Sequence, residues 1–243
     1  MSGHSKWATI KRQKGANDAK RGQLFTKLAN AITIAVKHGG GNTDPNFNAS
    51  LRLAIDKAKG ANMPEEGIER AIQKGAGGPG GVELDEVMYE GFAQGGVGLL
   101  VEAVTDKKQR TVAEVKNVIE KNGGTMAGQG AVSYLFEKTG EIIVPKNGKS
   151  ADDIMNIALE NMVSDIEDDD EVMYLYTEPS NLQIAKNGLE QSGLTIEEAS
   201  LIFRPMSRMT VSPEIEEKVI GLIEKLEEMD DVQKVYTNLE FAS

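Results

Sequence analysis

The stretch Gly75-Ala76-Gly77-Gly78-Pro79-Gly80-Gly81 divides this chain into two parts of different character. It offers almost no side chain to bury and has a very free backbone, which predicts a linker between domains, centred on residues 76–81. Apolar residues before it recur at helical spacing, whereas strand-like and helical segments alternate after it. At about 150 residues per domain, a chain of this length should hold two or three domains. The sequence therefore predicts a multidomain α+β protein.

The first part is predicted to be a small antiparallel three-helix bundle over residues 17–75, because short connections join its helices. Apolar residues such as Leu24, Leu28 and Ile32 lie at helical spacing, and glycines end each segment. Asp44 is expected as the N-cap of the second helix, with Pro45 at its first position. The helices are expected from Asp18 to the glycines at 39–41, from Pro45 to Gly60, and from Pro64 to Gly75. Residues 1–16 show no period and are predicted to form a basic flexible arm.

The second part indicates two small α/β modules of the split βαβ type, since it has too few helices to cover a large parallel sheet. One module is inserted in the other if the final helix and strand return to complete the module begun at residue 82, a topology that periodicity alone does not decide. The middle domain is expected over residues 82–135 together with 206–243, and the inserted domain over 136–205. Thr111 and Glu114 form a possible capping box, and Ser212-Pro213 predicts the start of the last helix. Strands are expected at residues 87–92, 97–104, 132–136, 141–144, 172–176, 199–203 and 232–236, and helices after residues 111, 150, 180 and 212.

Charge is segregated along the chain. The net charge is −11, yet residues 1–81 hold 13 Lys and Arg against 6 Asp and Glu, a net of +7. Residues 82–243 hold 14 against 32, a net of −18. The acidic net charge of the whole chain therefore conceals a basic module attached to an acidic body. The basic module is the candidate contact for a polyanion.

Several classes of protein are excluded by what the sequence lacks. With no Cys there are no disulfides, thiolate metal sites or Cys nucleophiles, and a reducing compartment is expected. No segment reads as a signal peptide, and no apolar run approaches the ~20 residues of a membrane span, so we expect a cytoplasmic protein without a membrane partner. We find no pattern for a cofactor or a catalytic triad, and an enzyme is the least favoured class. No metal, cofactor or catalytic residue is predicted.

The candidate nucleic-acid-binding residues gather in the arm and the first helix. Lys and Arg can neutralise phosphates, and an exposed Trp can stack on an unpaired base, whereas the alternative is a solvated basic tail with Trp7 packed on the bundle. Arg110 is added because residues 106–111 lie between a strand and a helix start, where an anion or an ordinary capped turn is equally well accommodated. The predicted residues are His4, Lys6, Trp7, Lys11, Arg12, Lys14, Lys20, Arg21, Lys27 and Arg110.

Other chemical motifs are weak. His4 and His38 have no neighbouring cluster of ligands and are interpreted as non-ligands. The acidic run 165–171 fails the pattern of a calcium loop, because Asp170 stands where Gly is needed and Tyr176 where Glu is needed, so a solvated turn is predicted. The glycines at 95–96 fit a hairpin turn rather than a phosphate-binding loop.

Longer motifs resemble the YebC family, which includes a mitochondrial translational activator of a cytochrome oxidase subunit. The opening stretch 3–11 carries the resemblance, which continues through residues 18–22, 61–64, 89–91, 110–115 and 130–136. Where that family often reads Tyr-Gly-Pro-Gly-Gly, this chain has Phe92-Ala93-Gln94-Gly95-Gly96 and lacks the proline that would stiffen the turn.

The resemblance implies a three-domain fold whose middle domain is completed by the C-terminal segment, and a role in gene expression. Two roles are described for the family: DNA-binding transcriptional regulation, and ribosome-associated translation that acts on ribosomal RNA near the peptidyl-transfer centre and helps with proline-rich sequences. The expected partner is therefore DNA or ribosomal RNA, with the ribosome as a further possibility. The absence of a basic recognition helix favours RNA, whereas the oligomeric state is left open.

Overall fold

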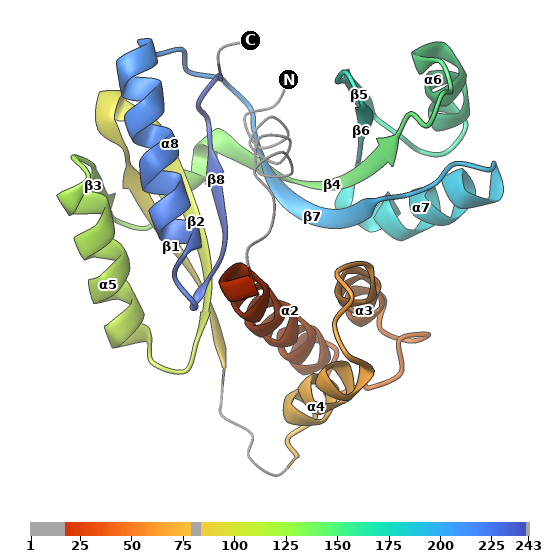
Figure 1. The fold of residues 1–243 in the computed structure, drawn as a ribbon, viewed down its shortest axis with the longest axis horizontal. Helices are drawn as coiled ribbons and strands as arrows, with labels where there is room; N and C mark the ends of the chain where they lie inside the picture. The colour runs from red at the N-terminus through yellow and green to blue at the C-terminus, as the bar shows by residue number, and fades with distance from the viewer. Residues whose placement is uncertain (1–17, 79–83, 242–243) are drawn as a thin grey trace.

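The computed structural model describes residues 18–78 and 84–241, so the predicted arm and part of the predicted linker lie outside the described residues. Helices α2 (Asp18–His38), α3 (Ala49–Gly60) and α4 (Glu65–Gly75) form the predicted bundle. Their apolar faces meet in one core, which includes Ile32, Val36 and Leu51. The bundle forms one lobe of the molecule, below two sheet-containing lobes (Figure 1).

The predicted N-cap of the second helix was wrong. Helix α3 begins at Ala49, and Asn48, not Asp44, is its cap: the Asn48 side chain accepts a hydrogen bond from the N–H of Leu51 at 3.0 Å. Asp44 instead closes the preceding turn by accepting from the N–H of Asn46 at 2.8 Å. Both residue types can cap a helix, and Asn48 prevails because its amide also bonds the carbonyl of Ala35 in α2, at 2.9 Å.

The middle sheet has the order β3-β1-β2-β8 and is antiparallel throughout. One face is covered by helices α5 (Lys108–Lys121) and α8 (Pro213–Glu227), whose apolar residues share a core with the sheet. The C-terminal segment thus returns to complete this sheet. Its strands are β1 (Asp85–Phe92), β2 (Gly98–Thr105), β3 (Thr125–Ala127) and β8 (Val232–Thr237).

The second sheet, of order β5-β6-β4-β7, is built entirely from the chain between residues 136 and 205. Helices α6 (Ala151–Leu159) and α7 (Leu182–Gln191) cover one of its faces. Tyr174 and Ile202 from this sheet share a core with Leu100 and Tyr236 of the middle sheet, so the two lobes pack together. The strands are β4 (Phe136–Pro145), β5 (Asp165–Asp168), β6 (Val172–Thr177) and β7 (Glu198–Pro205).

The fold class is thus α+β, with a helical bundle and two small α/β units, one inserted in the other. Exact domain boundaries stay a prediction. Two local expectations were wrong: Thr111 lies inside α5 rather than capping it, and residues 133–135 form a 3₁₀ turn rather than a strand. Strand β3 was not foreseen. The turn at Gly95 and Gly96 forms without the family's proline, since both glycines adopt φ of +81°.

The acidic run at 165–171 was also wrongly predicted, because its first half is strand β5 rather than a solvated turn. The carboxylates of Asp165 and Glu167 lie 2.6 and 3.0 Å from the guanidinium of Arg204, and Arg208 reaches Glu167 at 2.6 Å. Two arginines more than 30 residues away thus neutralise charges that a local pattern shows as unpaired. Hydrogen bonds from Arg204 also outweigh burial, so the pKa of Asp165 lies below its usual value.

Candidate nucleic-acid interface

The start of α2 is the described part of the predicted interface. Arg21 is exposed, and its guanidinium carbon lies 5.4 Å from the centre of the Phe25 ring. Lys27 donates to the backbone carbonyl of Glu227, and Gln23 donates to that of Glu228 at 3.1 Å. These carbonyls end helix α8, where the helix dipole favours a cation. Lys27 therefore holds α2 against the middle domain.

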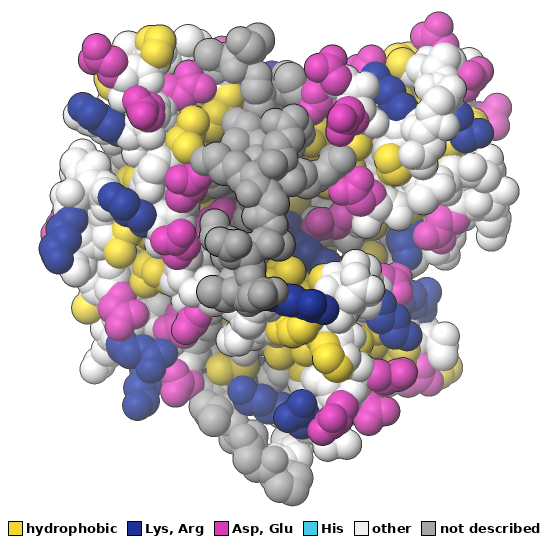
Figure 2. All heavy atoms as spheres, viewed as in Figure 1, with side chains coloured by type: hydrophobic (Ala, Val, Ile, Leu, Met, Phe, Trp, Pro, Cys, Tyr) yellow, Lys and Arg dark blue, Asp and Glu magenta, His cyan; other side chains and the backbone are white. Residues whose placement is uncertain are grey.

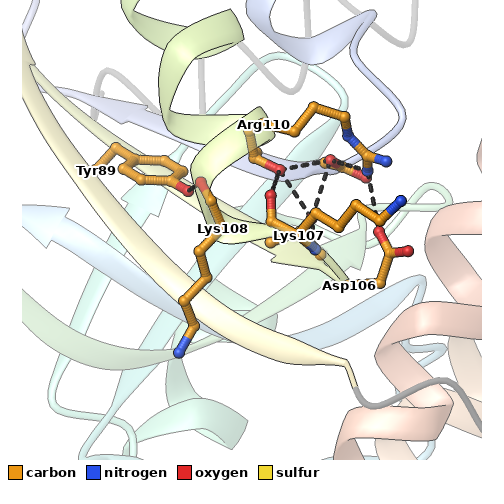
Figure 3. A network of polar contacts seen from close by, with 8 residues as sticks. Tyr89, Asp106, Lys107, Lys108 and Arg110 are labelled. Atoms are coloured by element: carbon orange, nitrogen blue, oxygen red, sulfur yellow. Dashed lines mark hydrogen bonds and ion pairs between the residues drawn. The ribbon is translucent and has the colours of Figure 1, made fainter.

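Arg110 belongs to a polar network at the start of α5 (Figure 3). Its guanidinium lies 2.8 Å from Asp231 and 3.1 Å from Asp106. The buried hydroxyl of Thr111 lies 2.6 Å from Asp231 and 2.8 Å from the hydroxyl of Thr105. Burial alone would raise the pKa of Asp231, but the hydrogen bonds from Thr111 and Arg110 outweigh it and lower the pKa. The predicted anion site thus already holds a carboxylate of the same chain.

A hollow of about 450 Å³ brings Arg110 near the start of α2. Acidic side chains outnumber basic ones in this hollow. Further acidic side chains spread over both sheet-containing lobes on the face that Figure 2 shows. The negative charge of these side chains opposes the approach of a phosphate group. The hollow is lined by Gln23, Arg110, Glu114, Glu228, Met229, Asp230 and Asp231.

The structure therefore brings only some of the predicted residues together. His4, Lys6, Trp7, Lys11, Arg12 and Lys14 lie outside the described residues, as does the side chain of Lys20. Of the other three, Lys27 and Arg110 are engaged with groups of the protein, and Arg21 is exposed beside Phe25. Their role as a nucleic-acid contact remains a prediction.

A second, larger cleft of about 630 Å³ lies where α2 and α3 face both sheets. Lys57 of α3 pairs with Glu198 of β7 at 2.7 Å, and Lys234 of β8 reaches the hydroxyl of Ser200 at 3.2 Å. Tyr236 donates to the carboxylate of Glu102 at 3.0 Å, and burial together with that carboxylate raises the pKa of the phenol well above its usual value. The bundle and both sheets thus line this cleft, and the Lys57–Glu198 pair joins α3 to β7.

Burial and neighbouring charges oppose each other at the two lysines of this cleft. Burial disfavours the charged form of Lys57, but Glu198 outweighs it and raises the pKa of the ammonium group. Burial and the charge of Lys57 lower the pKa of Lys234. No sequence motif marks this cluster, because its residues come from separate strands and one helix.

Within the described ranges, no three His, Cys, Asp or Glu side chains come together to hold a metal ion. His38 is exposed, and its Nε2 lies 3.8 Å from a carboxylate oxygen of Glu86. Nor does any helix of residues 18–78 and 84–241 have the length and apolar character that a membrane span requires.

Comparison with known proteins places the whole chain. A family model described as "TACO1/YebC second and third domain" matches residues 84–239, and one described as "TACO1/YebC protein N-terminal domain" matches residues 5–78. The chain belongs to the TACO1/YebC family. This finding confirms the resemblance seen in the sequence motifs.

Curated TACO1/YebC relatives match over nearly their full length. Proteins of Thermoanaerobacter pseudethanolicus and Acidithiobacillus ferrooxidans, both named "Probable transcriptional regulatory protein", are 47% and 48% identical. The matches cover 99% and 100% of this chain and 97% and 96% of those proteins. The crystal structure of a conserved hypothetical protein from Aquifex aeolicus is 44% identical, with a TM-score of 0.87 over 93% of each chain. The names of the two curated relatives thus describe those proteins as probable regulators of transcription.

Proposed function

We propose that this TACO1/YebC protein is a non-enzymatic, nucleic-acid-binding regulator of gene expression whose contact surface is the basic N-terminal third. The segregation of charge carries the proposal: a net of +7 precedes residue 82 and a net of −18 follows it. A polyanion is attracted to one end and repelled by the other, which confines contact to the first. The names of the relatives favour DNA and transcription as the setting.

A ribosomal-RNA-binding role in translation is the second candidate, and the state of the bundle's lysines supports it. Lys27 and Lys37 donate to the backbone carbonyls of Glu227 and Leu84, and Lys57 pairs with Glu198. In the described residues, these cations secure α2 and α3 to the body rather than forming a basic recognition face. Contact through the arm is then favoured over a helix in the major groove, and such arms suit irregular RNA.

Salt dependence of binding tests the proposal. Each neutralised phosphate adds about 0.7–0.9 to the slope of log K against log salt, so deleting residues 2–16, which removes four cations, should lower the slope by roughly three. Lys11→Glu with Arg12→Glu should abolish binding and leave the melting temperature unchanged. The matched control is Lys116→Glu with Lys121→Glu on the exposed face of α5. An unchanged slope after the deletion would exclude the arm.

Crosslinking in cells separates the two targets. The bound nucleic acid is sequenced after crosslinking of the full-length protein. Discrete promoter DNA supports transcriptional regulation, whereas enrichment of ribosomal RNA supports the translational role. Recovery of neither above the level of the Lys11→Glu, Arg12→Glu variant contradicts both.

A further inference from the structure

The loop between β3 and β4 is held rigidly by one buried carboxylate. Glu90 of β1 is only 4% exposed, and it accepts hydrogen bonds from the N–H groups of Gly130, Val132 and Ser133 at 2.7, 2.6 and 2.9 Å. Val132 is itself fully buried and packs near Gly98 of β2. A carboxylate held by three backbone donors fixes a loop in one conformation.

This rigid loop displays an aromatic side chain to solvent. Tyr134 is 65% exposed although the residues that flank it in sequence are partly buried. Met206, 60% exposed, belongs to a segment bonded to this loop, because its N–H donates to the carbonyl of Leu135 at 2.8 Å. The exposed side chains of Tyr134 and Met206, on these two bonded segments, are called the Tyr134 patch below.

The segments that form the Tyr134 patch are unusual in this acidic body. Residues 121–136 contain no Asp or Glu, and neither do residues 199–213. On neighbouring strands, Asp165 and Glu167 of β5 are matched by Arg204 and Arg208, whereas Glu137, next to Phe136 in β4, is exposed. A polyanion repelled elsewhere on residues 82–243 therefore meets no uncompensated carboxylate from these two segments.

We propose that the Tyr134 patch is a second nucleic-acid contact, at which the Tyr134 ring stacks on an unpaired base. This inference rests on the proposed function and adds a specificity to it. The protein should bind single-stranded or looped nucleic acid in preference to a continuous duplex. Stacking on an aromatic ring tolerates any base, and it gains most when the ring is already fixed before binding. The Glu90 hydrogen bonds fix the backbone that carries this ring.

Binding of a fluorescent 20-nucleotide single-stranded RNA to the full-length protein tests the patch. Tyr134→Ala should bind roughly 5- to 150-fold more weakly, the range that base stacking on an aromatic side chain covers. Tyr134→Phe keeps the ring and should bind like the wild type. Leu159→Ala, which removes an equally exposed apolar side chain at the end of α6, is the matched control and should change nothing. All variants should melt at the wild-type temperature, since the altered groups are exposed.

The outcomes separate this inference from the proposed function. If the wild type binds RNA and Tyr134→Ala binds equally well, the patch is no nucleic-acid contact while the basic arm stands. If the wild type binds neither RNA nor DNA, both proposals fail. If Tyr134→Ala binds RNA normally but loses a protein partner captured by the wild type, the patch is a protein-binding surface and the inference is overturned.

Discussion

Glu90 shows how a single side chain can organise a segment distant in sequence. Burial alone would raise the pKa of this carboxyl, but the three N–H donors of residues 130–133 outweigh burial and hold its pKa below the usual value. Because the native pKa lies below the unfolded one, the stabilisation is complete above about pH 5 and is lost as the pH falls through the native pKa.

Glu90→Gln is therefore expected to lower the free energy of unfolding by ~1.5–3 kcal/mol at pH 7, because a buried charged acceptor is replaced by an amide that turns a donor toward donors. Chemical denaturation at pH 7 and in steps to pH 3 measures this. The difference from wild type should shrink as the pH falls. Glu137→Gln changes an exposed carboxylate two residues after the loop and should leave the free energy of unfolding unchanged. Equal stability of both variants at pH 7 would show that the loop does not depend on Glu90.

At the scale of single residues, the sequence reveals the type of each residue but not the group that it pairs with in the fold. Arg110 reads as a phosphate-binding candidate because it is basic and near a helix start, yet Asp231, 121 residues away, pairs with it. Thr111 reads as a helix cap for similar reasons, but it is buried and bonded to that same aspartate. The competing partner arrives only when the C-terminal segment folds back, so no local pattern can show it.

Helix α3 offers the sharpest test at the scale of elements, since two candidate caps precede it. Asn48 caps α3 and at the same time bonds the carbonyls of Ala35 and Asn42, at 2.9 and 3.3 Å. Asn48→Ala should thus lower the free energy of unfolding by ~1–2 kcal/mol, since it removes the cap of α3 and the side-chain bonds to α2 and the turn, although the carbonyl of Ala35 keeps the N–H of Gly39 at 3.1 Å. Asp44→Ala removes only a turn contact and should cost under ~1 kcal/mol. Thermal unfolding of both variants gives the comparison, and a larger loss for Asp44→Ala would restore the original prediction.

Elements with strong apolar periodicity were predictable, and those defined by pairing were not. Helices α2, α4 and α8 lie close to their predicted ranges, because glycine, proline and apolar spacing mark them. Strand β5 was invisible because its residues are mostly acidic, and β3 spans only three residues. Their strand character comes from hydrogen bonds to β6 and β1.

At the scale of the whole molecule, the insertion of one sheet unit into another could be anticipated from the family resemblance, whereas periodicity alone did not decide whether the last helix and strand return to the middle domain. The cleft between the three lobes could not be anticipated from the sequence, since Lys57 comes to lie near Glu198 and Lys234 only when the bundle docks. As to the predicted interface, the comparisons establish the family, whereas the contact residues stay predictions.

Lys57 joins α3 of the bundle to β7, and it gives the prediction for the whole molecule. Lys57 faces Glu198, and the carboxylates of Glu141 and Glu102 also act on it. Lys57→Ala leaves these carboxylates with less compensation, so they repel one another. Because the pair is about one-third exposed, solvent screens part of the loss, and a cost of ~1–3 kcal/mol is expected.

Small-angle X-ray scattering should show a larger radius of gyration for Lys57→Ala as the bundle loosens from the sheets, whereas Lys59→Ala, an exposed lysine on the same helix, should match the wild type. Adding Glu198→Gln to Lys57→Ala should recover part of the stability, because it removes one of the repelling charges. That recovery separates electrostatic docking from mere loss of packing by the lysine stem, which Glu198→Gln cannot restore. An unchanged radius together with no recovery would mean that apolar contacts alone hold the bundle in place.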